Sequence, residues 1–109
     1  MTDISVTCAG SAVFDILAKT SADSLPIGVL GLVDTFSTAE GGPALRTGRV
    51  LAGMGVETKL IIPTGDDIFG QSFHRTVPAP HLHVDWIDAD QPTSTSMVLV
   101  DRAGERTML

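Results

Sequence analysis

A helix with a face of small residues is predicted in the middle of the sequence, where it starts at Pro43 and stops at Gly55. Proline suits the first helical position, because its missing N–H group would have no partner inside the helix there. At 100° per residue one face collects mainly small residues: Ala44, Gly48, Leu51, Ala52 and Gly55. Arg46 and Arg49 fall on the opposite side. Glycine costs about 1 kcal/mol inside a helix, so this face predicts a helix packed closely against a sheet.

Strand patterns on both sides of the helix predict an α/β fold. Residues 4–8 alternate apolar and polar side chains and lead to Gly10, which marks the end of a first strand. Residues 28–36 are apolar and β-branched and are predicted as a second strand. Residues 59–62 form a short continuous apolar stretch, which is typical of a strand covered on both faces.

The C-terminal half continues with a helix, a strand and a hairpin. A helix is expected over residues 69–76, with Asp67 as its N-cap. Residues 81–87 alternate as a strand does. Residues 97–108 predict a β-hairpin in which Gly104 takes a positive φ in the turn.

Composition excludes several classes of function. The chain has 109 residues, enough for one domain, and 43% of them are hydrophobic, too many for a disordered chain. The net charge is −6 and the seven Lys and Arg residues are dispersed, so nucleic acid is not expected as a partner. No apolar run approaches the roughly 20 residues of a membrane span. The single cysteine, Cys8, and an N-terminus without a signal-peptide layout predict a cytoplasmic protein.

Two features are candidates for ligand binding, each with an ordinary structural alternative. The junction of Gly41 and Gly42 with the helix can offer unshielded backbone N–H groups to hydroxyls, carboxylates or phosphates, or it can be a plain helix start. Asp15, a few residues beyond the first strand, can accept hydrogen bonds from a polyol or can be a solvated loop residue. Taken alone, each feature favours the structural alternative.

No metal site is predicted. The adjacent carboxylates of GDDIFG, residues 65–70, suit a helix N-cap better than a metal, because adjacent side chains on a turn point apart. His81 and His83 share one strand face, but the sequence shows no third ligand beside them.

Four motifs follow one another along the chain: GSAVFD at residues 10–15, GGPALRTGRVLAGMG at 41–55, GDDIFG at 65–70 and GER at 104–106. In this order they resemble the N-terminal part of the ribokinase-like (PfkB) family of carbohydrate and nucleoside kinases. The resemblance runs over nearly the whole chain. It implies that residues 1–109 are an incomplete domain of that family: a partial Rossmann-like, three-layer α/β fold with β-lid strands near residues 28–36 and 97–108, lacking its C-terminal part.

The resemblance also implies a sugar site. Asp15 matches the aspartate that binds substrate hydroxyls, and Gly41 and Gly42 match the glycine pair whose N–H groups approach the sugar. Arg46 stands where the family has a substrate-binding asparagine. Arginine is a cation with no acceptor. This exchange therefore predicts weak or no binding of neutral sugars, through a preference for an anionic or phosphorylated substrate or through loss of the pocket.

ATP and Mg²⁺ are implied by the family as cofactors. The catalytic aspartate of the family lies in a G-A-G-D segment, which nothing in this chain matches. The expectation is therefore a sugar-binding portion of an ATP-dependent carbohydrate kinase that is inactive alone. The alternatives are a non-catalytic sugar-binding or strand-pairing module, or a decayed kinase fragment. Sheet edges left uncovered, or the lid strands, predict self-association.

Overall fold

The computed structural model describes residues 4–24 and 27–109. The chain forms two compact units, the first from residues 1–13 and 40–94 and the second from residues 14–39 and 95–109. It passes from one unit to the other after residues 13, 39 and 94.

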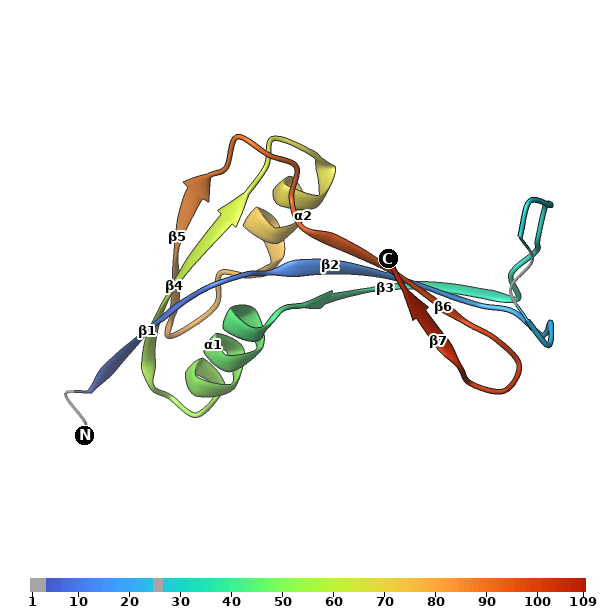
Figure 1. Ribbon diagram of the computed structural model, residues 1–109. Coiled ribbons are helices and arrows are strands. Elements are labelled where there is room, and N and C mark those ends of the chain that lie inside the picture. Colours follow the sequence, from blue (N-terminus) through green and yellow to red (C-terminus); the bar gives the residue numbers. More distant parts are fainter. Residues whose placement is uncertain (1–3, 25–26) are drawn as a thin grey trace. The chain divides into compact units, whose positions relative to one another are not determined.

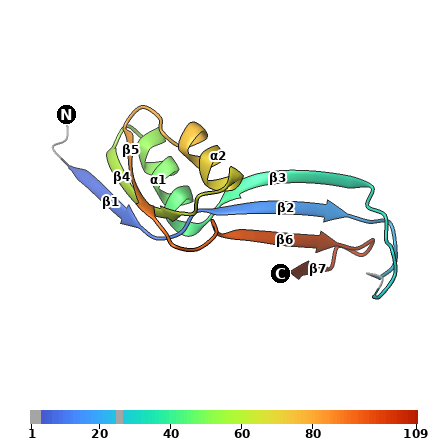
Figure 2. The ribbon, with the colours of Figure 1, turned by 90° about the horizontal axis from the view of Figure 1, so that it is seen from above.

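The first unit is a parallel sheet with two helices. Its strands, in the order β1-β4-β5, are β1 (Ser5–Ala9), β4 (Glu57–Thr64) and β5 (Leu82–Asp88). Its helices are α1 (Pro43–Gly53) and α2 (Ile68–Thr76), and both lie on the same side of the sheet (Figure 1; Figure 2). Leu60 of β4 lies between Cys8 of β1 and Val84 of β5. The predicted α/β class is confirmed.

Strand β4 is buried on one face only. Its buried side chains alternate along the strand: Thr58, Leu60, Ile62 and Thr64. Lys59 and Asp85, on the neighbouring strands β4 and β5, form an exposed ion pair of 2.8 Å. The expectation of a strand covered on both faces is wrong for the described residues, because both helices pack on the same face.

Helix α1 packs closely on β4, as its small face predicts. A Cβ atom added at Gly48 would lie 2.3 Å from Cδ2 of Leu60, so only glycine allows this approach without a shift of Leu60. Leu45 is fully buried in this contact, and Leu51, which the helical pattern also placed there, is half-buried. Helix α2 contributes Phe73, which is fully buried. The core of the first unit therefore lies between the sheet and the two helices.

The second unit is a four-stranded mixed sheet in the order β3-β2-β6-β7. Its strands are β2 (Val13–Lys19), β3 (Thr35–Gly41), β6 (Thr95–Val100) and β7 (Arg106–Met108). Strand β6 pairs in parallel with β2 and antiparallel with β7. Gly104, between β6 and β7, has φ 84°, so the predicted hairpin is confirmed.

Three strand predictions need correction. Residues 28–34 are not a strand, and β3 begins only at Thr35. Leu30 and Leu32 are 91% and 81% exposed there, so the part of the chain that the structure describes leaves these two side chains largely unburied. The segment around Asp15 is part of β2 rather than a loop. Strand β5 starts one residue late, because His81 has φ 65° and leaves the extended conformation.

Neither described helix is long and apolar enough to cross a membrane.

Candidate functional site

Helix α1 begins at a position that requires glycine. Gly42, its N-cap, has φ 101°. A Cβ atom added to Gly42 would lie 2.5 Å from the carbonyl oxygen of Ser11 and 2.9 Å from Cα of Ala12. Among the described residues no side chain caps this helix. The first-turn N–H groups of α1 are therefore not covered by a capping side chain, which is the arrangement that a ligand-binding helix start needs.

The other predicted residues of the first unit lie beside this helix start. Gly41 is buried and is the last residue of β3, whose final two residues, Glu40 and Gly41, count with the first unit. Arg46 lies one turn into α1, where its backbone N–H donates to the carbonyl oxygen of Gly42 at 3.0 Å and its side chain is exposed. Arg49, the other arginine of α1, has a charged partner, because its guanidinium forms an ion pair with Glu40 at 2.7 Å. Among the described residues no carboxylate pairs with Arg46, so its positive charge stays uncompensated near the helix start.

Asp15 belongs to the second unit and lies on strand β2. Its Oδ1 atom accepts a hydrogen bond of 2.6 Å from Oγ of Ser96, which lies directly opposite on β6. Both side chains are half-buried. The four predicted site residues thus divide between the units, with Gly41, Gly42 and Arg46 in the first and Asp15 in the second.

The turn after β4 is held by a network of Gly65, Asp67, Gly70 and Thr93. Asp67 caps α2 as predicted, since its Oδ1 accepts from the N–H group of Gly70 at 2.8 Å. Its two carboxylate oxygens also accept from the hydroxyl and the N–H group of Thr93, at 2.7 and 2.8 Å. The Gly70 N–H group, followed by the two Thr93 donors, lowers the pKa of Asp67 below its ordinary value of 3.8.

Thr93 was not found from the sequence. It is 4% exposed, and its Oγ1 accepts from the N–H group of Gly65 at 2.9 Å. The only signal was a hydroxyl residue between Pro92 and Ser94, which is common in loops. Because Thr93 precedes β6 by two residues, the network fixes the point where the chain leaves the first unit.

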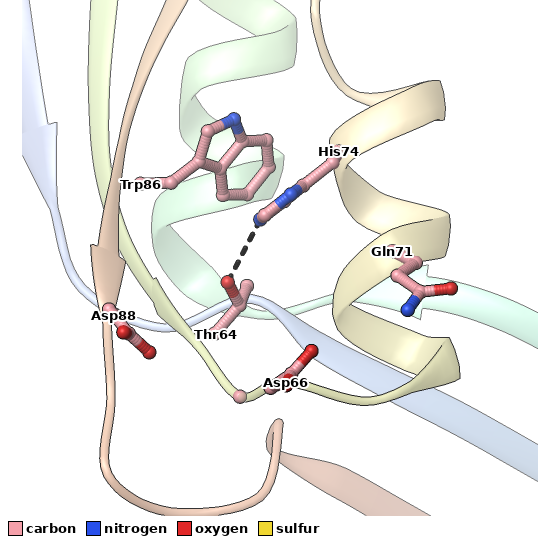
Figure 3. A pocket seen from close by; sticks show the side chains of 7 residues that line it. Thr64, Asp66, Gln71, His74, Trp86 and Asp88 are labelled. Atoms are coloured by element: carbon pink, nitrogen blue, oxygen red, sulfur yellow. Dashed lines mark hydrogen bonds between the residues drawn. The ribbon is translucent and has the colours of Figure 1, made fainter.

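A cavity of about 340 Å³ lies at the carboxyl ends of β4 and β5 (Figure 3). The ring of His74 packs against Trp86 with centroids 4.2 Å apart, and its Nε2 lies 3.0 Å from Oγ1 of Thr64. The lining residues come from β4, α2, β5 and the turn after β4: Thr64, Gly65, Asp66, Gln71, His74, Trp86 and Asp88. None of the four predicted site residues is among them, and sequence reasoning missed the cavity.

The two histidines singled out in the sequence share one partner. His81 and His83 both contact the carboxylate of Glu57, at the start of β4. The hydrogen bond with His81 is the main cause that lowers the pKa of Glu57 below its ordinary value of 4.5. Within residues 4–24 and 27–109 no group of three or more His, Cys, Asp or Glu side chains is placed to hold a metal ion.

The two hollows at the carboxyl ends of β4 and β5 have no Lys or Arg among their lining residues that could hold a triphosphate. A triphosphate needs cations or convergent N–H donors, whereas the cavity at β4 and β5 carries the carboxylates of Asp66 and Asp88. A second hollow beside it is lined by Asp66, Asp67, Asp88 and Asp90. This end of the first unit is therefore acidic.

The model of the pfkB family of carbohydrate kinases matches residues 3–109. A search of the curated proteins finds no match. Ribokinase of Arabidopsis thaliana, solved with ribose and ATP, is 20% identical with a TM-score of 0.83, covering 100% of this chain and 36% of its own. A carbohydrate kinase from Agrobacterium tumefaciens is 20% identical with a TM-score of 0.80, covering 96% of this chain and 34% of its own. The tetrameric inhibited form of phosphofructokinase-2 from Escherichia coli is 16% identical with a TM-score of 0.69, covering 100% and 35%.

These likenesses show the fold, and the chain spans about a third of the length of the solved structures it matches. They confirm the expected partial ribokinase fold. Since the family model covers nearly every residue, the chain belongs to the pfkB family of carbohydrate kinases.

Proposed function

We propose that these 109 residues are the substrate-binding, N-terminal part of an ATP-dependent carbohydrate kinase and cannot transfer a phosphoryl group alone. The observation that carries the proposal is the start of α1, where Gly42 is fixed by its φ of 101° and no described side chain caps the helix. In a member of this family, that geometry suits backbone N–H donors to sugar oxygens.

The proposed roles follow from what each group can donate or accept. The N–H groups at Gly41 and Gly42 donate to oxygens of the sugar, and Asp15 on β2 accepts from its hydroxyls. The guanidinium of Arg46, exposed on α1, only donates and attracts anions. A neutral sugar therefore binds weakly, and a phosphorylated or carboxylated sugar gains from this charge.

Phosphoryl transfer needs groups that the described residues do not supply. When bound, ATP provides the phosphoryl group and Mg²⁺ neutralises its charge, and catalysis consists of positioning and electrostatic stabilisation around them. The described carboxylates near the ends of β4 and β5 form no such site. The activity belongs, in this proposal, to a longer polypeptide or to a partner that completes the domain.

Binding of sugars tests the role of Arg46. We expect the unmodified chain to bind neutral pentoses and hexoses weakly or not at all in calorimetric titrations. Arg46→Asn, which restores both a donor and an acceptor, should tighten binding by about tenfold, the effect of one hydrogen bond of 1.4 kcal/mol. Arg75→Asn, an equal charge change at an exposed position of α2, is the control. Tight binding by the unmodified chain and loss in Arg46→Asn would contradict the proposal.

An assay of phosphoryl transfer tests the second half of the proposal. The purified chain, incubated with ATP, Mg²⁺ and a panel of sugars, should yield no sugar phosphate above a control without protein. Mass spectrometry of the products measures this directly. Sugar phosphate formed by the chain at a rate above the control overturns the statement that it is inactive alone.

A second candidate, a strand-pairing interaction module, is favoured by one observation. Strands β1 and β5 each pair only with β4 among the described strands, so each presents an outer edge. Because such edges can also pair with each other, we propose that copies of the chain associate.

The lone Cys8, free in the structure, supports a cytoplasmic location.

A further inference from the structure

Glu40 directly precedes the glycine pair at the start of α1, and its carboxylate contacts both helices of the first unit. Oε1 of Glu40 accepts a hydrogen bond of 2.7 Å from Nη2 of Arg49 on α1. Oε2 accepts a hydrogen bond from the hydroxyl of Thr76, the last residue of α2. Thr76 lies 36 positions beyond Glu40 in the sequence, so this second contact depends on the packed fold. Each oxygen of the carboxylate is therefore held by a different helix.

The chemistry of the three groups gives both hydrogen bonds a fixed direction. An ionised carboxylate only accepts hydrogen bonds, and the guanidinium of Arg49 only donates them. The hydroxyl of Thr76 also lies 3.0 Å from the carbonyl oxygen of Ser72, one turn earlier in α2. The carboxylate is the stronger of the two acceptors, because hydrogen bonds to a charged group are about twice as strong as neutral ones. The proton of Thr76 therefore goes to Glu40.

The contacts of Glu40 are better suited to fixing a position than to adding stability. The side chains of Arg49 and Glu40 are 38% and 20% exposed, and ion pairs that water reaches contribute little to the free energy of unfolding. Two hydrogen bonds that lead to two different helices restrict where the carboxylate can lie. They thereby restrict the backbone of Glu40 as well.

The backbone that follows Glu40 belongs to Gly41 and Gly42, which have more conformational freedom than any other residue type. On one side, Gly42 lies close to the carbonyl oxygen of Ser11, which a Cβ atom at Gly42 would approach to 2.5 Å. This contact is steric and limits Gly42 in one direction only. Glu40 attaches the preceding residue to α1 and α2, and so restrains the glycine pair from the other side.

We propose that Glu40 is a positioning residue that holds the backbone of Gly41 and Gly42, so that their N–H groups are ordered before a ligand arrives. The proposal rests on the sugar-binding function proposed above, and it adds to that function a residue that does not contact the sugar. Ordering a loop costs free energy during binding, and a contact that orders the loop beforehand raises the affinity. Arg49 and Thr76 take part only through the carboxylate of Glu40.

The positioning role is tested without any sugar, by NMR relaxation of the two glycine amides. We expect backbone order parameters of about 0.85 for the glycine pair in the unmodified chain and a fall toward about 0.6 in Glu40→Ala. Glu40→Gln should keep the higher values, because its amide can still accept from Arg49 and donate to the hydroxyl of Thr76. Glu105→Ala, the same chemical change at an exposed residue, is the matched control.

A change at Thr76 tests whether the effect passes through Glu40. We expect the glycine amides to become more mobile in Thr76→Val, which keeps the shape but loses the hydroxyl, and to stay unchanged in Thr76→Ser. Urea unfolding of each variant separates this local effect from a loss of global stability. Order parameters of the glycine pair that stay unchanged in Glu40→Ala overturn the proposal. If Glu40→Ala does not fold, the same comparison in Thr76→Val decides.

Titrations with D-ribose test the effect on affinity, in the Arg46→Asn background. Because this sugar is neutral, the charge that Glu40→Ala leaves unpaired on Arg49 does not attract it. We expect Glu40→Ala to weaken binding by about threefold or more, and Glu40→Gln to stay within about twofold of the parent. Equal affinities of the parent and Glu40→Ala overturn the gain in affinity. If no variant binds D-ribose, the proposed function fails, and the order parameters alone decide whether Glu40 positions the glycine pair.

Discussion

At the residue scale, Gly42 shows how a single missing side chain shapes the candidate site. Its φ of 101° and ψ of 143° belong to a region that residues with a Cβ atom avoid. In addition, the carbonyl oxygen of Ser11 leaves no space for a Cβ atom at this position. We expect Gly42→Ala to lower the free energy of unfolding by at least about 2 kcal/mol. Urea unfolding followed by circular dichroism measures the change.

Gly53, in the last turn of α1, is the control for that substitution. A Cβ atom there would meet nothing within 4 Å, so Gly53→Ala should stabilise the helix by up to about 1 kcal/mol. Opposite signs for the two Gly→Ala changes would support the steric argument. Equal unfolding midpoints for Gly42→Ala and the unmodified chain would refute it.

At the element scale, the cap of α2 makes stability depend on pH. Donors from Gly70 and Thr93 hold the pKa of Asp67 below 3.8 in the folded chain. Its contribution to stability is therefore complete above the unfolded pKa and is lost as the pH falls through the lower folded pKa. We expect the difference in unfolding free energy between the unmodified chain and Asp67→Asn to be largest at neutral pH and to shrink below about pH 3.8.

Unfolding of both chains between pH 2 and 7 checks this expectation, with pH values chosen around the ordinary pKa of an aspartate. Asp66→Asn is the control, because Asp66 is exposed and receives none of the hydrogen bonds of the network of Gly65, Asp67, Gly70 and Thr93. It should change stability at pH 7 by less than about 0.5 kcal/mol. If the difference in unfolding free energy between the unmodified chain and Asp67→Asn does not vary with pH, the lowered pKa of Asp67 does not contribute to stability and the prediction is wrong.

Elements with local signals could be predicted from the sequence, and elements that depend on distant partners could not. Pro43 and Asp67 mark the starts of α1 and α2 within a few residues, because a helix makes its hydrogen bonds with near neighbours. Strand β2 was missed, since its partner β6 lies about 80 positions away and the sequence shows no trace of the register. Conversely, residues 28–34 have the composition of a strand but are not assigned as one, and Asp34 alone among the described residues there donates a backbone hydrogen bond to β2, to the carbonyl oxygen of Lys19 at 2.7 Å.

The residues of the candidate site also fall into those that local motifs indicate and those that depend on distant contacts. The motifs singled out Gly41, Gly42 and Asp15 as candidates, and the structure gives Gly42 a conformation and a close contact with Ser11 that favour glycine. Ser96 and Thr93 carry no signal of their own in the sequence. Their importance comes from contacts with Asp15 and Asp67 across the fold, which pairing of strands and closure of loops create.

At the scale of the whole molecule, the uncovered edges of the parallel sheet predict association between copies. Light scattering after size exclusion should show a mass that rises with concentration. Ser5→Lys, at the exposed start of β1 beside Glu57, should reduce the association, because a charge at a sheet edge opposes pairing with another chain. Thr47→Lys, on the exposed side of α1, is the control with the same change of charge. A constant monomer mass at all concentrations would contradict the prediction.

Segments of the two units alternate along the chain, so the order of synthesis determines which strands can pair first during translation. Strand β2 emerges from the ribosome about 80 residues before β6, the strand that supplies Ser96. At about 5–20 residues per second, β2 waits roughly 4–16 s for that partner. During this interval residues 40–94 complete the first unit, so its sheet can form before the mixed sheet closes. Until β6 is synthesised, β2, the strand that carries Asp15, has only β3 as a neighbour, and its other edge is open to wrong pairing.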